Sequence, residues 1–435
     1  MNKEINGKKL ILTMVIIFIV ASAGILVGRW SIKNVGAEVE GYEELKVFTE
    51  ALTLVKKNYV EPVKQQELVY SSIKGMLNSL DPHSVFMNPE MYKEMQVDTK
   101  GEFGGLGIQI GIKDGMLTVI APIEDTPAFR AGIKAGDKIL KINDEHTKDM
   151  SLHEAVTKMR GVPSTSVKIT IIREGWQKTK DFTIVREIIK IKSVKSKLLE
   201  EGIGYIKLTQ FQEQTASDLL KAIENLTEKN MNSLILDLRN NPGGLLNSAV
   251  DVTSYFLPPD QLVVYIKDRE ENKTEYLSSN GQSEIELPMI VLVNEGSASA
   301  SEIVAGALKD WNRAVIMGTP TFGKGSVQSV IPLSDGSAIR LTTAMYYTPK
   351  GISIQTTGIK PDIIVKQTLR EGEKGRPVIR EKDLEGHLDN EKEIETGAPE
   401  EIIPIKVDEE NDVQLQRAID LLKTWRVFKE IPKAT

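Results

Sequence analysis

Two short segments of the sequence carry residues that could do covalent chemistry together. Residues 297–302 read SASASE and follow an apolar run from Met289 to Asn294. A serine in that turn, Ser299 by register, would lie beside the free amides of a helix that begins near Glu302, and such amides can stabilise an oxyanion. Ser299 and Glu302 also fit the S-x-x-E capping box, so a purely structural role is the alternative.

Few residue types remain to activate that serine. The chain has no cysteine, and none of its four histidines lies in the region that carries Ser299. This argues against a Ser-His-Asp triad but does not exclude one, because a triad can be assembled from residues that are distant in sequence. Lysine is the remaining base, provided that burial lowers its pKa from about 10.4 by several units. Lys324 is the candidate, since glycines flank it. In an extended chain Gln328 would face the same way and could orient the neutral amine.

Two other kinds of site fit less well. Residues 318–324 have the G-x-x-x-x-G-K spacing of a phosphate loop, but Gly325 replaces the hydroxyl residue that would hold magnesium. The residues that follow predict a strand, whereas a phosphate loop requires the start of a helix. No H-E-x-x-H or comparable ligand cluster occurs. We therefore expect neither a metal nor a cofactor.

The region from 99 to 186 predicts a mainly β domain. Short apolar runs alternate with turns, and one helix-like stretch covers 152–159. This order resembles a PDZ domain. The groove residues implied by that resemblance are Gly105, Leu106, Gly107 and Ile108, whose backbone amides would hold a terminal carboxylate beside a strand edge open to an extended peptide. A dinucleotide-binding site is not expected here, because the glycines do not fit the G-x-G-x-x-G spacing. Arg160 is a candidate for coupling this groove to the active site, with a solvated arginine as the alternative.

The remaining pattern predicts three further regions. Strands alternate with helices over 187–365, which is typical of an α/β domain. Helical apolar spacing covers much of 38–98 and returns over 413–435, whereas 366–412 is charged and predicts a linker or extended segment. The net charge of -6 provides no basic field for nucleic acid.

The amino-terminal residues predict a membrane segment. Residues 10–28 form an uncharged apolar run long enough to cross a bilayer, and the basic tail 1–9 precedes them. That charge would hold the tail in the cytoplasm and place the rest outside. Residues 21–23 resemble a cleavage site, so a removed signal peptide and a secreted protein are the alternative.

Three segments resemble one known family. Residues 294–303 (NEGSASASEI), 322–328 (FGKGSVQ) and 237–244 (DLRNNPGG) look like signatures of the carboxyl-terminal processing, or tail-specific, serine peptidases. The resemblance runs from about residue 43 to 365, in that family's order of helical segment, PDZ domain and ClpP/crotonase-like α/β core. It implies that Ser299 is the nucleophile, with Ser297 and Ser301 as lesser candidates by register, Lys324 the base and Gln328 the orienting residue. The implied oxyanion-hole amides are those of Ala300 and of Gly243 or Gly244.

The resemblance also implies a function. It predicts a membrane-anchored protease whose PDZ domain captures the tails of extracytoplasmic proteins, which the Ser-Lys dyad cleaves near their carboxyl ends through an acyl-enzyme. Family behaviour further implies a homodimer and an activating or regulatory protein. The rivals are a PDZ adaptor with an inactive core and a trypsin-like protease that uses a histidine such as His83 or His153.

Overall fold

The computed structural model describes residues 42–279, 285–368, 375–390, 402–404, 407 and 411–430. The chain divides into two compact units, 1–76 and 77–435. The predicted membrane segment 10–28 and its basic tail 1–9 lie outside the described residues. No helix in the described ranges is long and apolar enough to cross a membrane.

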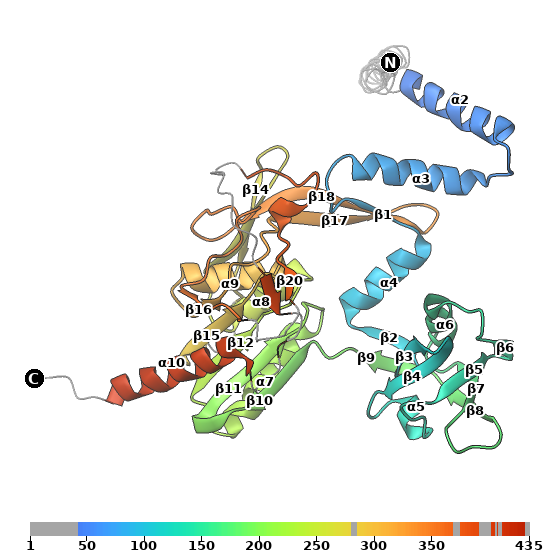
Figure 1. Cartoon of the computed structure of the whole chain (residues 1–435). Helices are drawn as coiled ribbons and strands as arrows, with labels where there is room; N and C mark the ends of the chain where they lie inside the picture. The colour runs from blue at the N-terminus through green and yellow to red at the C-terminus, as the bar shows by residue number, and fades with distance from the viewer. Residues whose placement is uncertain are drawn as a thin grey trace, which may run out of the picture. The chain divides into compact units, whose positions relative to one another are not determined.

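The amino-terminal helical region consists of separate helices. Helix α2 covers Tyr42–Asn58 and helix α3 covers Gln65–Asn78 (Figure 1). The intervening residues include Pro62, whose ring is incompatible with a continuing helix. The apolar stripe of α2 is exposed: Leu45 keeps 62% and Val55 43% of its accessible surface. A third helix, α4 (Pro89–Lys100), begins at the side-chain cap Asn88.

The PDZ-like region folds as an antiparallel sheet in the strand order β3-β4-β5-β7-β8, with β6 paired to β5. Its strands are β3 (Ile108–Lys113), β4 (Met116–Pro122), β5 (Lys138–Ile142), β6 (Glu145–His146), β7 (Ser166–Ile172) and β8 (Lys180–Val185). Helices α5 (Pro127–Arg130) and α6 (Leu152–Met159) complete the domain around its own buried core. The chain enters and leaves through the ribbon of β2 (Glu102–Gly105) and β9 (Glu187–Lys190).

The α/β domain is built on a six-stranded sheet in the order β10-β11-β12-β15-β16-β19. Its strands are β10 (Val194–Leu198), β11 (Ile203–Leu208), β12 (Ser233–Asp237), β15 (Met289–Val293), β16 (Val315–Gly318) and β19 (Ile363–Ile364), with the 3-10 turn η1 (Glu200–Gly202) before β11. All neighbours from β11 to β19 are parallel, and β10 is an antiparallel edge.

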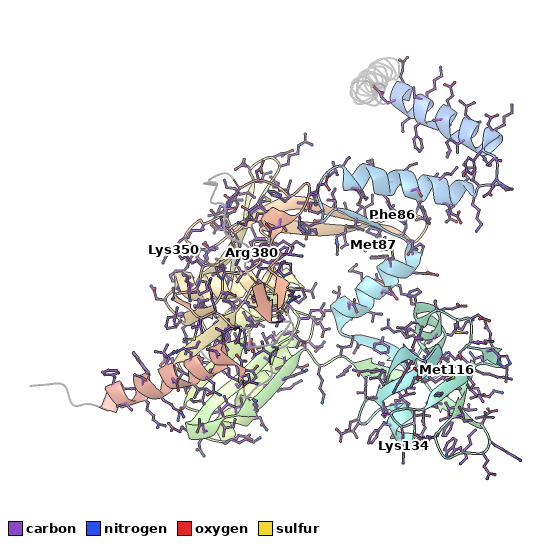
Figure 2. The ribbon with its side chains drawn as sticks, viewed as in Figure 1. Phe86, Met87, Met116, Lys134, Lys350 and Arg380 are labelled. Atoms are coloured by element: carbon purple, nitrogen blue, oxygen red, sulfur yellow. The ribbon has the colours of Figure 1, made fainter. Side chains whose placement is uncertain are left out.

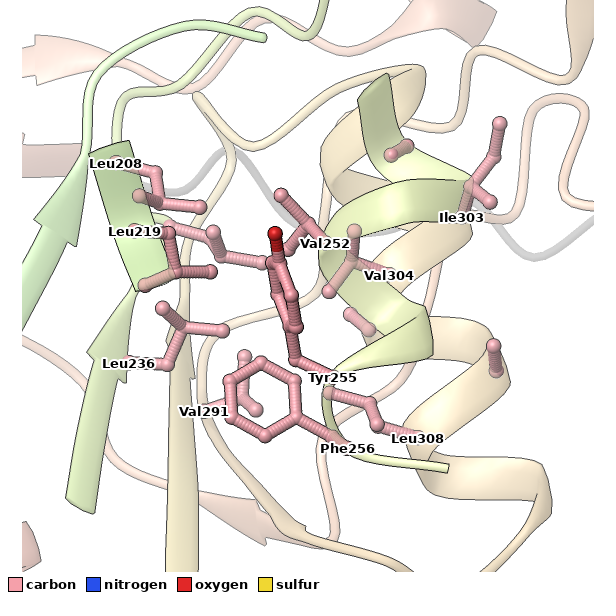
Figure 3. Packing of buried hydrophobic residues seen from close by; sticks show 14 of the residues in the cluster. Leu208, Leu219, Leu236, Val252, Tyr255, Phe256, Val291, Ile303, Val304 and Leu308 are labelled. Carbon is pink, nitrogen blue, oxygen red and sulfur yellow. The ribbon is translucent and has the colours of Figure 1, made fainter. Parts of the chain in front are cut away.

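Helices cover both faces of this sheet. Helices α7 (Thr215–Glu228), α8 (Leu246–Ser254) and α9 (Ala300–Asp310) pack on one face, where Figure 3 shows Val252, Phe256 and Val304 against strand residues such as Leu236. Helix α10 (Val413–Glu430) packs with Leu415 and its neighbours against the other face. Because side chains alternate along a strand, a fully apolar strand such as β15 serves both layers.

A second sheet carries the loop that contains Lys324. Strand β18 (Ala338–Tyr347) is its centre and pairs with β1 (Val85–Met87), β13 (Leu262–Asp268) and β17 (Ser326–Pro332), while β14 (Lys273–Leu277) pairs with β13. Phe86 of β1 is fully buried (Figure 2). The remaining elements are β20 (Gly375–Pro377), η2 (Glu381–Asp383) and β21 (Ile402–Pro404).

Candidate active site

Ser299 lies in the turn between strand β15 and helix α9. Its φ of 54° is in the left-handed region, which residues with a side chain rarely adopt and which concentrates at functional sites. The two neighbouring serines serve the loop instead. The Ser297 hydroxyl donates to Leu238 O (2.8 Å), and the Ser301 hydroxyl donates to Asn241 O (2.9 Å). Ser299 is thus the serine in the turn with the strained backbone.

The 237–244 loop packs against this turn because β12 and β15 are parallel neighbours whose carboxyl ends meet at one edge. Asn240 N donates to Asn294 Oδ1 (2.8 Å), and Ala298 N donates to Asn241 O (3.0 Å). A Cβ on Gly243 would lie 2.9 Å from Ser299 Cβ and 3.0 Å from Ala300 N. Glycine at 243 therefore allows the loop to close on the nucleophile.

The predicted oxyanion-hole amides differ in their present bonding. Gly243 N already donates to Asn241 Oδ1 (2.9 Å). Within the described residues, the amides of Gly244 and Ala300 have no hydrogen-bond partner. Gly244 packs against the backbone of Phe211, which leaves no room for a side chain. The two candidate glycines are thus both required sterically, and Gly244 has the unpaired amide.

Lys324 lies between strands β16 and β17, in a loop rather than in a strand. Burial and, to a smaller extent, the guanidinium of Arg340 lower the pKa of its amine to about 8. Three carboxylates act in the opposite direction: those of Glu381, Glu302 and Asp81. Among the described residues the Lys324 amine has no hydrogen-bond partner, and this includes the Ser299 hydroxyl. An amine that is desolvated but unpaired loses its proton readily.

The buried side chain of Glu302 joins the nucleophile turn to the Lys324 loop. Its Oε2 accepts from Ser299 N (2.8 Å) and Lys324 N (3.0 Å), and its Oε1 accepts from Gly323 N (2.8 Å) and Thr321 Oγ1 (2.5 Å). Burial raises the pKa of Glu302 to about 7, although these hydrogen bonds lower it. The sequence indicated only the capping contact. The bonds to the second loop join residues about twenty positions apart, for which no local pattern exists.

Tyr346 is a further site residue that the sequence did not indicate. It is fully buried on β18, and its hydroxyl donates to the backbone carbonyl of Lys324 and also interacts with the Ser299 side chain. Burial raises the pKa of Tyr346 well above its usual value, so the hydroxyl keeps its proton. An apolar–aromatic strand pattern gave no reason to single it out.

The Gln328 side chain faces the same way as that of Ser326, as an extended segment requires, but the structure does not bond it to Lys324 in the described residues. Strand β17 begins at Ser326, and a register shift separates Val327 from Gln328. The Gln328 amide donates to Ser326 Oγ (3.0 Å) and Thr342 Oγ1 (3.3 Å). In the described residues it makes no hydrogen bond to Lys324, so its orienting role stays a prediction.

The PDZ domain has a groove between β3 and α6. Leu106, Gly107 and Ile108 line it as expected, together with Met159 and Arg160. Gly107 has a φ of 76°, and a Cβ there would lie 2.3 Å from the Thr126 side chain, so only glycine fits. Gly105 ends strand β2, where a Cβ would meet the Phe103 ring.

Arg160 stacks within the PDZ domain. Its guanidinium carbon lies 4.4 Å from the centroid of the Phe103 ring, at the rim of the groove. This distance is typical of a cation–π contact. The contact explains how Arg160 is held in place, and coupling to the active site stays a prediction.

The histidines do not approach the nucleophile. The His83 ring bonds to the Glu381 carboxylate, and His153 lies exposed, 3.4 Å from a Glu94 oxygen. Within the described residues no histidine is hydrogen-bonded to Ser299, and no group of three or more His, Asp or Glu side chains could hold a metal ion. The described site offers a lysine, rather than a histidine, in a desolvated setting and in a loop that Glu302 joins to the Ser299 turn.

Comparison with known proteins settles the family. The sequence model of peptidase family S41 matches residues 202–365, that of the PDZ domain matches 118–173, and that of the activating protease CtpB N-terminal domain matches 28–91. The carboxy-terminal-processing protease of Bartonella bacilliformis is 45% identical over 417 residues, which is 94% of this chain and 95% of that one. This chain belongs to the carboxy-terminal processing serine proteases.

Other members are more distant from this protease. The carboxy-terminal processing protease CtpB of Bacillus subtilis is 37% identical over 335 residues, or 76% of this chain and 70% of that protein. The solved structure of the photosystem II D1 C-terminal processing protease has 32% identity and a TM-score of 0.44, covering 73% of this chain and 86% of that one. The resemblance inferred from three short segments is thus confirmed at the level of the family, the PDZ domain and serine-protease activity.

Proposed function

We propose that this protease cleaves extracytoplasmic proteins near their carboxyl ends with a Ser299–Lys324 dyad. The observation that carries the proposal is the state of Lys324: its amine is buried, unpaired among the described residues, and has its pKa lowered to about 8. A lysine acts as a general base only when its neutral form is accessible near physiological pH. The shared Glu302 carboxylate supports the pairing, since it ties the Lys324 loop to the Ser299 turn.

The chemistry follows from these positions. The neutral Lys324 amine accepts the Ser299 proton when its side chain swings within hydrogen-bonding distance, and Ser299 Oγ attacks the peptide carbonyl. The amides of Ala300 and of Gly243 or Gly244 hold the oxyanion. Lys324 then returns the proton to the leaving amine, and water hydrolyses the acyl-enzyme. Gln328 would turn toward Lys324 in the substrate-bound form.

The PDZ groove supplies the preference for tails. Glycine-rich backbone near Gly107 offers amides to a terminal carboxylate, and the exposed edge of β3 accepts an extended peptide. The apolar lining, including Leu106 and Met159, favours an apolar last residue. The Arg160 side chain at the rim would report occupancy to the protease core.

The setting of the protease is part of the same proposal. The uncharged run over 10–28 after a basic tail supports a single-pass anchor with the catalytic part outside the cytoplasm. The exposed apolar stripe of α2 supports a homodimer. The match to the amino-terminal domain of an activating protease supports a regulatory protein partner.

Product analysis tests the dyad. An unstructured extracytoplasmic protein with an apolar carboxyl end is incubated with wild type, Ser299→Ala and Lys324→Ala, and the fragments are measured by mass spectrometry. Wild type should release short carboxyl-terminal peptides, and both variants should release none while keeping their circular dichroism spectra. Lys350→Ala, an exposed lysine labelled in Figure 2, is the matched control. Full activity in Lys324→Ala would reject the dyad, and tail binding without turnover by wild type would favour an adaptor.

A further inference from the structure

A buried carboxylate that the proposed mechanism does not use lies beside the Lys324 loop. Glu381 begins the turn η2, beyond the residues that match peptidase family S41, and its side chain is fully buried. Arg380, labelled in Figure 2, immediately precedes it. The Glu381 oxygens accept hydrogen bonds from His83 Nε2 (2.7 and 2.9 Å) and from Gln355 Nε2 (3.0 Å).

Glu381 is connected to the Lys324 loop on both sides of the lysine. On one side, Glu381 N donates to Phe322 O (3.1 Å). On the other, Gly325 N donates to Gln355 Oε1 (2.8 Å), and the amide of the same glutamine donates to the Glu381 carboxylate. A Cβ on Gly325 would lie 2.5 Å from Gln355 N, so the glycine allows this contact. The loop from 322 to 325 is therefore held at one end by the backbone amide of Glu381 and at the other by the Gln355 side chain, which the Glu381 carboxylate fixes in turn.

The carboxylate also acts on the charge of the Lys324 amine. Four charged groups act on it, those of Arg340, Glu381, Glu302 and Asp81, and His83 is bonded to one of them, Glu381. Burial and Arg340 lower the lysine pKa, and among the opposing carboxylates Glu381 has the largest effect. Arg340 and His83 lie close together, since Arg340 Nε donates to His83 O (3.4 Å).

We propose that Glu381 is a positioning residue for the Lys324 base: it fixes the 322–325 loop and stabilises the protonated amine against Arg340. This inference rests on the proposed role of Lys324. It makes the segment after the family-matched region part of the active site. It also gives His83 a role, which is to hold the Glu381 carboxylate through its Nε2 while the turn of Asp81 holds the His83 backbone.

The test is the pH profile of kcat/KM for Glu381→Gln, which keeps the shape of the side chain and removes its charge. Wild type should show an acidic limb with a midpoint near 8. Loss of a neighbouring charge should move that midpoint down by about one unit. A displaced loop should lower the plateau by roughly tenfold. Arg340→Gln should move the midpoint up, and Glu385→Gln, an exposed carboxylate of the same segment, should leave it unchanged.

A purely structural Glu381 would lower stability or the plateau and leave the midpoint in place, which would overturn the proposal. If Glu381→Gln does not fold, Glu381→Asp replaces it. An unchanged plateau and an unchanged midpoint in that variant would also overturn the proposal.

A measurement that does not depend on activity distinguishes the proposed dyad from the proposed role of Glu381. NMR titration of isotope-labelled methylated lysines in the Ser299→Ala background, assigned with Lys324→Arg, reports the amine directly. If Lys324→Ala is active, the dyad itself is rejected. If Lys324→Ala is inactive but Glu381→Gln leaves the titration midpoint of the Lys324 amine unchanged, only the role of Glu381 is rejected.

Discussion

Two buried cations of the α/β domain have opposite environments. The Arg239 guanidinium donates to both oxygens of Asp237 (2.7 and 3.0 Å), to both oxygens of Asp412 (2.7 Å each) and to Gln414. The Lys324 amine has no hydrogen-bonding or ion-pair partner among the described residues. Burial alone would lower the pKa of both groups, but the two carboxylates raise that of Arg239 above its usual range. That of Lys324 falls to about 8.

The difference shows how one domain uses burial for two purposes. A buried cation with matched carboxylates stays charged and joins the elements that supply them. A buried cation without such partners gives up its proton and becomes a base. The cluster of Asp237, Arg239 and Asp412 thus holds helix α10 to the sheet, while the environment of Lys324 favours its neutral amine, as the proposed base requires. The following predictions test this contrast.

Replacing Lys324 by Met should have the largest effect. Methionine fills similar volume without an acid–base group, so acylation of Ser299 should fall by at least about a thousandfold. The measurement is single-turnover cleavage of a peptide substrate. A rate within tenfold of wild type would show that the unpaired amine is not the base.

Replacing Arg239 by Met should have the largest effect on stability. It removes the cation that the carboxylates of Asp237 and Asp412 share and leaves only Lys207, 3.6 Å from Asp237, which should lower the free energy of unfolding by about 3–5 kcal/mol. Urea denaturation measures this, and Arg269→Met, at an exposed position, should stay within about 0.5 kcal/mol of wild type. Equal stability of the two variants would contradict a structural role for the cluster.

Lys324→Met should raise the free energy of unfolding, whereas Arg239→Met should lower it. The folded-state pKa of about 8 lies below the ordinary 10.5, so the folded protein binds this proton less tightly than the unfolded chain does. The resulting destabilisation is fully present below pH 8 and disappears as the pH rises to 10.5. The variant should therefore be more stable than wild type at pH 7 by about 1–3 kcal/mol. Denaturation at pH 7 and pH 10 checks this, and the gain should shrink at the higher pH.

The pH dependence of the wild type should be a smaller effect. With a base of pKa about 8, kcat/KM should rise roughly tenfold from pH 7 to pH 9 as Lys324 loses its proton. Below about pH 7 the Glu302 carboxylate also becomes protonated, since burial has raised its pKa. Its hydrogen bonds to the two loops then weaken, and the acidic limb should steepen. Initial rates from pH 6 to 9.5 test this, and a flat profile would exclude both groups.

Local sequence patterns were sufficient to predict the family, the PDZ domain and the α/β core. Ser299 could be selected because an apolar strand, a short turn and a capping glutamate are all local features. Lys324 could be selected because its flanking glycines are adjacent in sequence. Gln328 shows the limit of such reasoning, since the strand begins only at Ser326 and the Gln328 amide bonds to Ser326 and Thr342, a partner on another strand that no local pattern indicates.

The rest of the site depends on contacts between distant residues. The His83–Glu381 pair joins positions 298 residues apart, and Tyr346 reaches the Lys324 carbonyl from another strand. No spacing rule relates such residues. Glu381 also lies in a charged stretch for which the sequence predicted a linker or extended segment, because charge alone does not reveal which carboxylate becomes buried.

The position of Asp412 near the end of the chain has a consequence for biosynthesis. Arg239 is synthesised 173 residues before Asp412, whose carboxylate completes the set of hydrogen bonds around its guanidinium. Until then the 237–244 loop lacks this ion pair, and the sheet face that α10 covers is bare. Completion of that loop and burial of that sheet face are therefore coupled through one cluster of charges.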